Sequence, residues 1–68
     1  MKVYHGNYEN KEFIGEVETQ GELNKLINDY IKKIKFRCYY NRQWLKDDGT
    51  LVIDYGSHTE FFFVEGLL

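Results

Sequence analysis

Three consecutive phenylalanines, Phe61, Phe62 and Phe63, stand near the end of a chain of only 68 residues. In a β-strand, successive side chains point to opposite faces of the sheet, so at least one of these rings must face away from a layer that covers the other side. A chain this short forms one domain over residues 1–68, and folding buries only about 60% of the surface that the unfolded chain exposes. The phenylalanine run therefore places apolar rings on both faces of the sheet, and a short chain has few residues with which to cover both.

The clearest predicted element is one amphipathic helix from about residue 20 to residue 35. Its apolar positions recur at the helical period of 3.6 residues, which places them on a single stripe. They are Leu23, Leu26, Ile27, Tyr30, Ile31 and Ile34. Thr19 and Glu22 have the spacing of a capping box, in which each side chain binds a backbone N–H at the start of the helix.

Strand-like segments flank this helix on both sides. Residues 37–46, 51–55 and 60–64 are rich in aromatic and β-branched residues, and the turn Asp47-Asp48-Gly49 predicts a hairpin between the first two. Residues 2–8 and 12–17 resemble two further strands, although Tyr4, Tyr8, Phe13 and Ile14 do not alternate cleanly. We therefore expect an α+β fold of order β-β-α-β-β-β, with one helix packed on an antiparallel sheet and a C-terminal three-strand meander.

Apolar residues occupy both faces of the expected meander, yet a single helix can cover only one of them. Tyr39-Tyr40 and Leu51-Val52-Ile53 repeat the conflict that the phenylalanine run creates. Three arrangements would resolve it. The N-terminal hairpin closes over the second face, or another protein or a second copy of the chain covers it, or the rings remain partly exposed. Trp44 and one of the tyrosines are expected in the core.

Charge is unevenly distributed around a net charge of −2. Residues 32–46 carry six basic side chains and no acid, whereas residues 47–68 carry five acids and no base. The basic residues are Lys32, Lys33, Lys35, Arg37, Arg42 and Lys46. Either the acidic ends pair with this basic middle inside the fold, or the middle forms a patch that faces an acidic partner.

No recognisable catalytic or metal-binding pattern stands out. Cys38, His58 and Asp54 lack the spacing of a nucleophile with its base, and His5 and Glu60 add too few ligands for a metal site. The six glycines are isolated from one another, which is typical of turns rather than of a phosphate-binding loop. We therefore expect no enzymatic activity, no cofactor and no metal.

The single cysteine and the N-terminal sequence bear on location. A single cysteine cannot form a disulfide within the chain, and the absence of disulfides is typical of proteins in the reducing cytoplasm. The chain begins without the apolar run of a signal peptide, and no stretch approaches the ~20 apolar residues of a membrane span. We expect a soluble cytoplasmic protein with no membrane association.

The segment 32–46 also interleaves basic and aromatic residues, a combination that binds single-stranded nucleic acid by stacking and phosphate contacts. The net acidic charge and the absence of a known RNA-binding motif weigh against this interpretation. The more favoured hypothesis is a non-enzymatic protein-interaction module that binds another protein or forms a homodimer. The expected binding residues are Arg37, Tyr39, Tyr40, Arg42, Trp44, Phe61, Phe62 and Phe63.

One stretch of the chain carries a family resemblance. Tyr39-Tyr40 with Trp44, the turn Asp47-Asp48-Gly49, and the run Gly-Ser-His-Thr-Glu-Phe-Phe at 56–62 resemble short uncharacterised proteins encoded by phages and prophages of Gram-positive bacteria. The resemblance extends over about residues 13 to 64. It implies a small phage accessory protein in the cytoplasm of a bacterial host cell, which acts by binding a host or phage protein, for example a defence protein. It brings no activity or functional residues with it.

Overall fold

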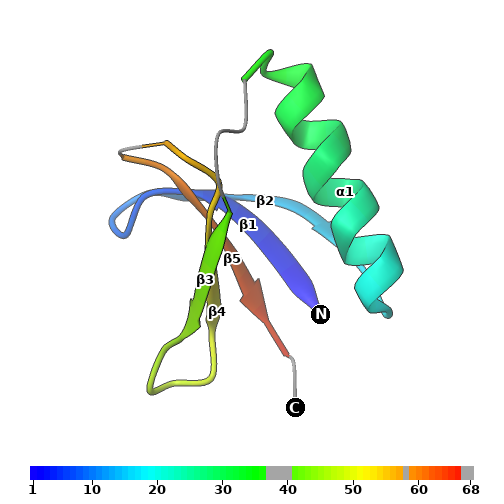
Figure 1. Ribbon diagram of the computed structural model, residues 1–68. Helices are drawn as coiled ribbons and strands as arrows, with labels where there is room; N and C mark the ends of the chain where they lie inside the picture. Colours follow the sequence, from blue (N-terminus) through cyan, green and yellow to red (C-terminus); the bar gives the residue numbers. More distant parts are fainter. Residues whose placement is uncertain (37–40, 58, 67–68) are drawn as a thin grey trace.

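The structure is a computed structural model that describes residues 1–36, 41–57 and 59–66. It contains one helix and one five-stranded antiparallel sheet (Figure 1). The elements are, in chain order, β1 (Lys2–Gly6), β2 (Lys11–Glu16), α1 (Gln20–Lys33), β3 (Arg42–Leu45), β4 (Leu51–Asp54) and β5 (Phe61–Glu65). The predicted α+β class and the order β-β-α-β-β-β are confirmed.

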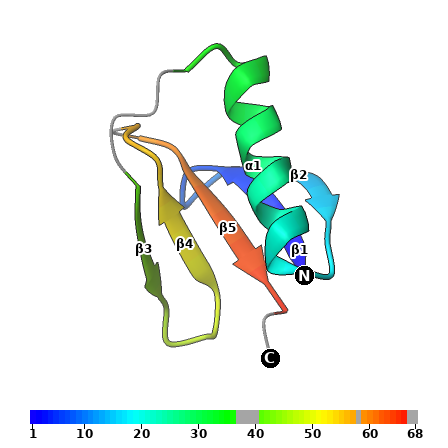
Figure 2. The same ribbon diagram turned by 45° about the vertical axis from the view of Figure 1, so that its right-hand side comes forward.

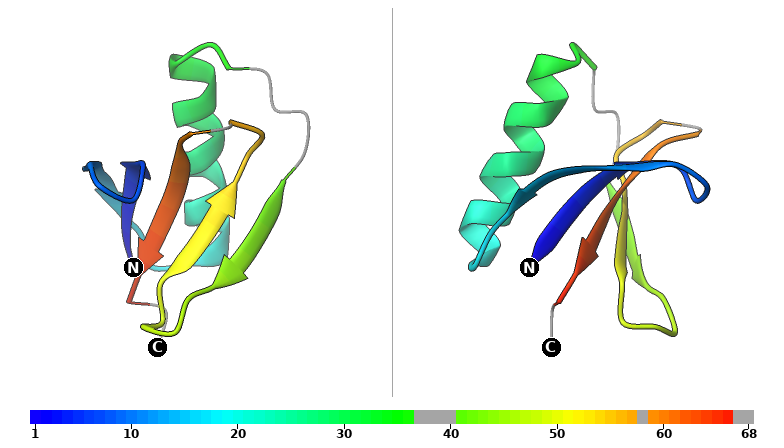
Figure 3. Two further views of the ribbon diagram at one scale, coloured as in Figure 1. Left: turned by 90° about the vertical axis from the view of Figure 1, so that its left-hand side faces the viewer. Right: turned by 180° about the vertical axis from the view of Figure 1, so that it is seen from behind.

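The strands lie in the spatial order β2-β1-β5-β4-β3 (Figure 3). The expected meander is present as β3-β4-β5, and the N-terminal hairpin β1–β2 joins it because β1 pairs with β5. This pairing runs from Lys2↔Glu65 to Gly6↔Phe61 and brings the two ends of the chain together in the middle of the sheet. The hairpin thus extends the same sheet and does not form a second layer.

Local signals set both ends of α1. Thr19 and Glu22 form the predicted capping box, in which the Thr19 hydroxyl accepts from the Glu22 backbone N–H at 3.1 Å. At the other end Lys35 takes a left-handed backbone conformation with φ 57°. The Phe36 N–H then bonds the Ile31 carbonyl and the Lys35 N–H the Lys32 carbonyl, which is the Schellman pattern of helix termination. The helix therefore stops at Lys33, slightly before the expected residue 35.

The helix covers one face of the sheet (Figure 2). Leu23, Ile27 and Ile31 are its buried residues, and they pack in one cluster with Phe62 and Val64 of β5. Val3, Val17, Ile53 and Tyr55 complete this cluster. Burial of apolar surface stabilises a fold by about 25 cal/mol per Å², so this cluster contributes substantially to the stability of so small a protein.

Strand β3 is shorter than the segment 37–46 that was expected to form it. The structure places Arg42–Leu45 in the strand and Lys32 and Lys33 in α1, while residues 37–40 lie outside the described part. The expectation that Trp44 lies in the core is wrong. Its side chain is 40% exposed, because β3 is an edge strand and Trp44 points away from α1.

Candidate functional site

A row of apolar side chains crosses the sheet face opposite α1. Tyr4 pairs with Phe13 on one side and with Phe63 on the other. Phe63 in turn pairs with Val52, and Val52 pairs with Trp44. The row thus runs through all five strands, one residue per strand, and Phe61 lies next to it on β5.

A β-bulge in β2 explains why the sequence did not reveal this row. Val3 pairs with Gly15 but the next residue, Tyr4, pairs with Phe13, so Ile14 is an additional residue on β2. Ile14 packs against the core beneath α1, whereas Phe13 faces the other way and contacts Tyr4 with ring centroids 5.5 Å apart. The imperfect alternation at Phe13-Ile14 was the available signal.

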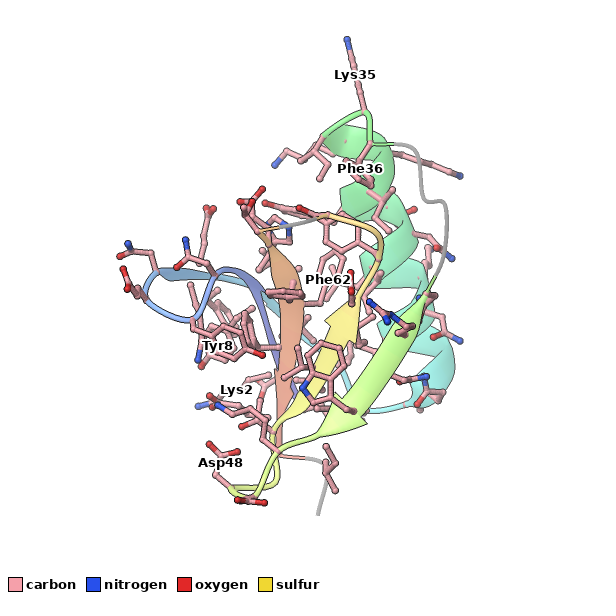
Figure 4. All side chains as sticks on the ribbon, turned by 60° about the vertical axis from the view of Figure 1, so that its left-hand side comes forward. Lys2, Tyr8, Lys35, Phe36, Asp48 and Phe62 are labelled. Carbon is pink, nitrogen blue, oxygen red and sulfur yellow. The ribbon has the colours of Figure 1, made fainter. Side chains whose placement is uncertain are left out.

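The turn of the N-terminal hairpin covers the middle of this row. Figure 3 shows that the turn projects on the side of the sheet away from α1, and Figure 4 shows Tyr8 beside β5 on that side. The Tyr8 ring lies 5.6 Å from that of Phe61 and 5.4 Å from that of Phe63. Phe63 and Val52 are therefore completely buried although no helix lies over them. The strands of the hairpin lie in the sheet, but its turn supplies part of the cover that the first of the three arrangements assigned to the hairpin.

Among the described residues, three rings on this side of the sheet keep two-fifths or more of their surface open to solvent. Phe13 is 54% exposed, Tyr8 52% and Trp44 40%. With Tyr4 and Phe61, both partly buried, they form the surface that we call the aromatic face. Partial exposure, the third expected arrangement, therefore applies to the borders of the row. The second arrangement, in which a partner covers these rings, stays a prediction.

Basic side chains lie over aromatic rings on this side of the sheet, and some of them also lie next to acidic side chains. The Lys11 Nζ lies 4.4 Å from the ring centre of Phe63, and the Lys46 Nζ lies 5.5 Å from that of Tyr8. Arg42 on β3 binds the buried carboxylate of Asp54 across the β3–β4 pair at 3.2 Å. The Lys46 Nζ also lies 3.8 Å from the carboxylate of Asp48, so two cations of the basic middle segment, Arg42 and Lys46, pair with acidic residues within the fold.

The predicted binding residues fall into three groups. Arg42, Trp44 and Phe61 lie on the aromatic face. Phe63 lies beneath it, fully buried, and Phe62 must be removed from the predicted surface because its side chain points into the core under α1 with no exposed area. Arg37, Tyr39 and Tyr40 lie outside the described residues. The sequence reasoning missed Tyr4, Tyr8 and Phe13.

A separate polar cavity opens on the other side of the sheet, near the end of α1. It has a volume of about 600 Å³ and includes His5, Glu12, Tyr30, Tyr55 and Glu60 in its lining. His5 Nε2 and the Tyr55 hydroxyl share a buried hydrogen bond of 2.7 Å. The ring of His5 also packs 4.6 Å from that of Tyr30, centre to centre.

Burial sets the protonation states in this cavity. It lowers the pKa of His5 below its ordinary value, although the carboxylates of Glu60 and Glu12 act in the opposite direction. Burial also raises the pKa of Tyr55 to about 12. At neutral pH the pair is therefore uncharged and serves to satisfy two buried polar groups inside an aromatic cluster.

The residues weighed for catalysis or metal binding are only partly described. Asp54 binds Arg42 and accepts from the Gly56 backbone N–H at 2.9 Å, while Cys38 and His58 lie outside the described residues. Within residues 1–36, 41–57 and 59–66, no group of three or more His, Cys, Asp or Glu side chains is arranged to hold a metal ion. In the same ranges no helix is long and apolar enough to cross a bilayer.

Comparison with known proteins returned no relatives. No protein-family model matches the chain, and neither a curated protein nor a solved structure does. Function is therefore inferred from the geometry of the aromatic face and of the sheet that carries it.

Proposed function

We propose that this chain is a non-enzymatic protein-interaction module whose partner binds the aromatic face. The observation that carries the proposal is the exposure of Tyr8, Phe13 and Trp44 on one side of the sheet, beside fully buried neighbours. Aromatic side chains are enriched at protein interfaces because a rigid ring buries a large area at a small cost in rotamer entropy. Contiguous apolar patches on a monomer usually mark such a site.

The surroundings of these rings suit an interface as well. Lys11, Lys46 and Arg42 border the rings, and Asp48 and Asp54 stand next to two of these cations. An apolar centre with a mixed polar border is the usual arrangement of a protein interface. Alternating charges at the border contribute to orientation and specificity more than to affinity.

The proposed setting follows from the resemblance of residues 13 to 64 to phage and prophage proteins. In that setting the chain is a small accessory protein in the bacterial cytoplasm, and its partner is a host or defence protein. A second copy of the chain is the alternative occupant of the face.

The test is capture of a partner by the immobilised protein from a lysate of a Gram-positive host. The variant Phe13→Ser/Trp44→Ser removes two exposed rings, and the control Lys25→Ser/Lys33→Ser alters only the solvent side of α1. We expect one protein to be retained by the wild type and by the control and to be lost with the ring variant. Retention by the ring variant, or no retained protein at all, contradicts the proposal. Light scattering over a range of concentrations separates a homodimer from a bound partner.

Single-stranded nucleic acid is the second candidate, favoured by Lys46 over the ring of Tyr8 and by Lys11 over the ring of Phe63. The described residues of the segment 32–46 do not form one strand, since Lys32 and Lys33 belong to α1 and Arg42–Leu45 form β3. Fluorescence anisotropy with single-stranded DNA and RNA at low and moderate salt decides between the candidates. Binding whose logarithm falls steeply with the logarithm of salt concentration supports the nucleic acid, and no binding at low salt removes it.

A further inference from the structure

The two edges of the sheet are protected to different degrees. Edge strand β2 contains the bulge at Ile14 and carries charges at Lys11, Glu12 and Glu16. The helix also approaches this edge closely, since a Cβ on Gly15 would meet the Leu26 side chain at 3.0 Å. Bulges, charges and covering elements are the usual means by which native sheets prevent another strand from pairing with an edge.

Edge strand β3 has little of this protection. It pairs with β4 in unbroken register over Arg42–Leu45, and all four of its residues are exposed. Two of them, Trp44 and Leu45, are large apolar residues, and Leu45 is 61% exposed. Among the described residues, none from β3 belongs to the cluster under α1. An exposed, regular and partly apolar edge is a template for an added strand.

Two residues of β3 have backbone N–H and C=O groups that point toward the open edge of the sheet. The Lys46 N–H donates to the Thr50 carbonyl at 2.8 Å, which makes Lys46 and Thr50 a hydrogen-bonded pair. Hydrogen-bonded and non-hydrogen-bonded pairs alternate along an antiparallel ladder, and the next pair in this register is Leu45↔Leu51. The N–H and C=O groups of Leu45 and, two residues earlier, of Gln43 therefore point away from β4.

A notch with uncharged walls lies beside β3 on the helix side. It has a volume of about 240 Å³, with Ile27 of α1 and Ile53 of β4 as its apolar residues. Five side-chain carboxamides complete the lining: Gln20, Asn24, Asn28, Asn41 and Gln43. Each carboxamide both donates and accepts hydrogen bonds, so the notch matches side chains that do the same and has no charged group to pair with a charged one.

We propose that the open edge of β3 binds an extended segment of a partner protein as a sixth antiparallel strand. This inference rests on the proposed function and specifies how the partner is held. Because side chains alternate, one residue of the segment on the helix side lies beside Gln43 and the notch, where Ser, Thr, Asn or Gln fits. The residue two positions along lies on the same side but beside Leu45, where an apolar side chain fits. The residue between them lies beside Trp44, where an apolar side chain continues the row that crosses the sheet. Backbone hydrogen bonds give the affinity and the two rows of side chains give the specificity.

A second copy of the chain fits this edge less well. Lys46 and Arg42 stand two residues on either side of Trp44, and both side chains lie on the side of the sheet away from α1. Two copies paired antiparallel about Trp44 would therefore set Arg42 of each opposite Lys46 of the other. Like charges directly opposite each other destabilise a strand pair. A partner segment escapes this conflict because it brings its own residues to those two positions.

The experiment is selection from a displayed library of random peptides of about twelve residues on the immobilised wild-type protein. Amide hydrogen exchange is then measured on the wild type with and without a synthetic copy of an enriched peptide. We expect enriched sequences in which one uncharged polar residue, beside Gln43, is followed or preceded by apolar residues beside Trp44 and Leu45. Their binding should slow exchange at the Gln43 and Leu45 amides by about tenfold or more and leave that of Trp44, already bonded to β4, unchanged.

The variant Gln43→Pro supplies the genetic test. Proline removes the outward N–H without removing a hydrogen bond to β4, so a folded variant should lose the enriched peptides. If the variant does not fold, the exchange pattern of the wild type decides alone.

Three outcomes overturn the inference: no peptide is enriched, Gln43→Pro binds the enriched peptides equally well, or the peptide protects other amides. Protection of Gln43 and Leu45 that rises with protein concentration alone assigns the edge to a second copy and overturns it too. A captured partner that depends on Phe13 and Trp44 but is retained by Gln43→Pro refutes the inference and leaves the proposed function intact.

Discussion

His5 and Tyr55 share a hydrogen bond of 2.7 Å between the His5 Nε2 and the Tyr55 hydroxyl, across 50 residues of sequence. Both side chains are buried, and the rings of Tyr30 and Phe62 pack against His5. The bond ties β1 to the end of β4 inside an otherwise apolar cluster. A buried polar pair of this kind is modest in net energy when complete and costly when one partner is lost.

Tyr55→Phe should therefore destabilise the fold more than the loss of one hydroxyl from a surface tyrosine. The ring contacts remain, but His5 Nε2 is left buried without its partner, which costs about 1–3 kcal/mol. Urea unfolding followed by circular dichroism gives the free energy of unfolding. Tyr8→Phe, on a ring that is half exposed, is the matched control and should change it by less than about 0.5 kcal/mol.

Equal effects of the two substitutions would mean that the His5–Tyr55 bond contributes nothing. The double variant His5→Phe/Tyr55→Phe refines the comparison, since replacing both partners removes the unsatisfied group. It should recover part of the stability that Tyr55→Phe loses.

The burial of His5 also predicts how stability depends on pH. The pKa of His5 is lower in the folded protein than its unfolded value of 6.5, so the unfolded chain binds the proton more readily. The stabilising contribution is therefore complete above pH 6.5 and is lost as the pH falls through the folded-state pKa. At pH 5.5 and above, carboxyl groups with ordinary pKa values stay ionised, so acidic side chains add little to the change in stability in that range.

The measurement uses His58→Gln as background, because it leaves His5 as the only histidine. An NMR titration of the His5 ring should give a pKa below 6.5, and the free energy of unfolding should decline from pH 7.5 to pH 5.5. In the same background His5→Gln should flatten that decline. A His5 pKa at or above 6.5 contradicts the structure at this site.

Phe63 tests whether the face opposite α1 has a core of its own. Phe63→Ala should cost about 3–5 kcal/mol, comparable with Phe62→Ala under the helix, because both rings are fully buried. Trp44→Ala, on the same face but at the edge, should cost about 1 kcal/mol or less. Urea unfolding of the three variants gives the comparison. A loss for Phe63→Ala as small as that for Trp44→Ala would show that Tyr8 does not cover the row.

The helix and the meander were predictable from sequence because their signals are local. The apolar stripe and the capping box at Thr19 and Glu22 identify α1, and the turn Asp47-Asp48-Gly49 identifies the β3–β4 hairpin. The pairing of β1 with β5 has no such signal, since it joins segments at opposite ends of the chain. The strand order of the sheet and the role of its first hairpin followed only from the structure.

The candidate site was only partly predictable for the same reason. The phenylalanine run correctly implied apolar side chains on two faces, but alternation alone does not say which ring faces α1. Trp44 was expected in the core because of its size, whereas its position on an edge strand leaves it exposed. The contribution of Phe13 depends on the bulge at Ile14, which breaks the period of two that sequence reasoning uses.

The turn that carries Tyr8 is built around Gly6 and Asn7. Gly6 has φ 152°, and a Cβ there would collide with the backbone carbonyl oxygen of Asn10. That oxygen accepts from the Asn7 N–H at 2.9 Å, and the Asn7 side chain accepts from the N–H groups of Glu9 and Asn10. The colliding atom is therefore held in place by the turn and has little freedom to move aside.

Gly6→Ala should accordingly destabilise the fold by about 2–3 kcal/mol and displace Tyr8 from Phe61 and Phe63. Gly49→Ala is the matched control, because Gly49 also has a positive φ of 89° but has open space around its Cβ position. It should cost only the backbone strain, about 1 kcal/mol. Urea unfolding gives both energies, and the ring-current shifts of the Phe61 and Phe63 protons report the position of Tyr8. If Gly6→Ala costs no more than Gly49→Ala and leaves those shifts unchanged, the turn does not hold Tyr8 against β5 in the way the structure places it.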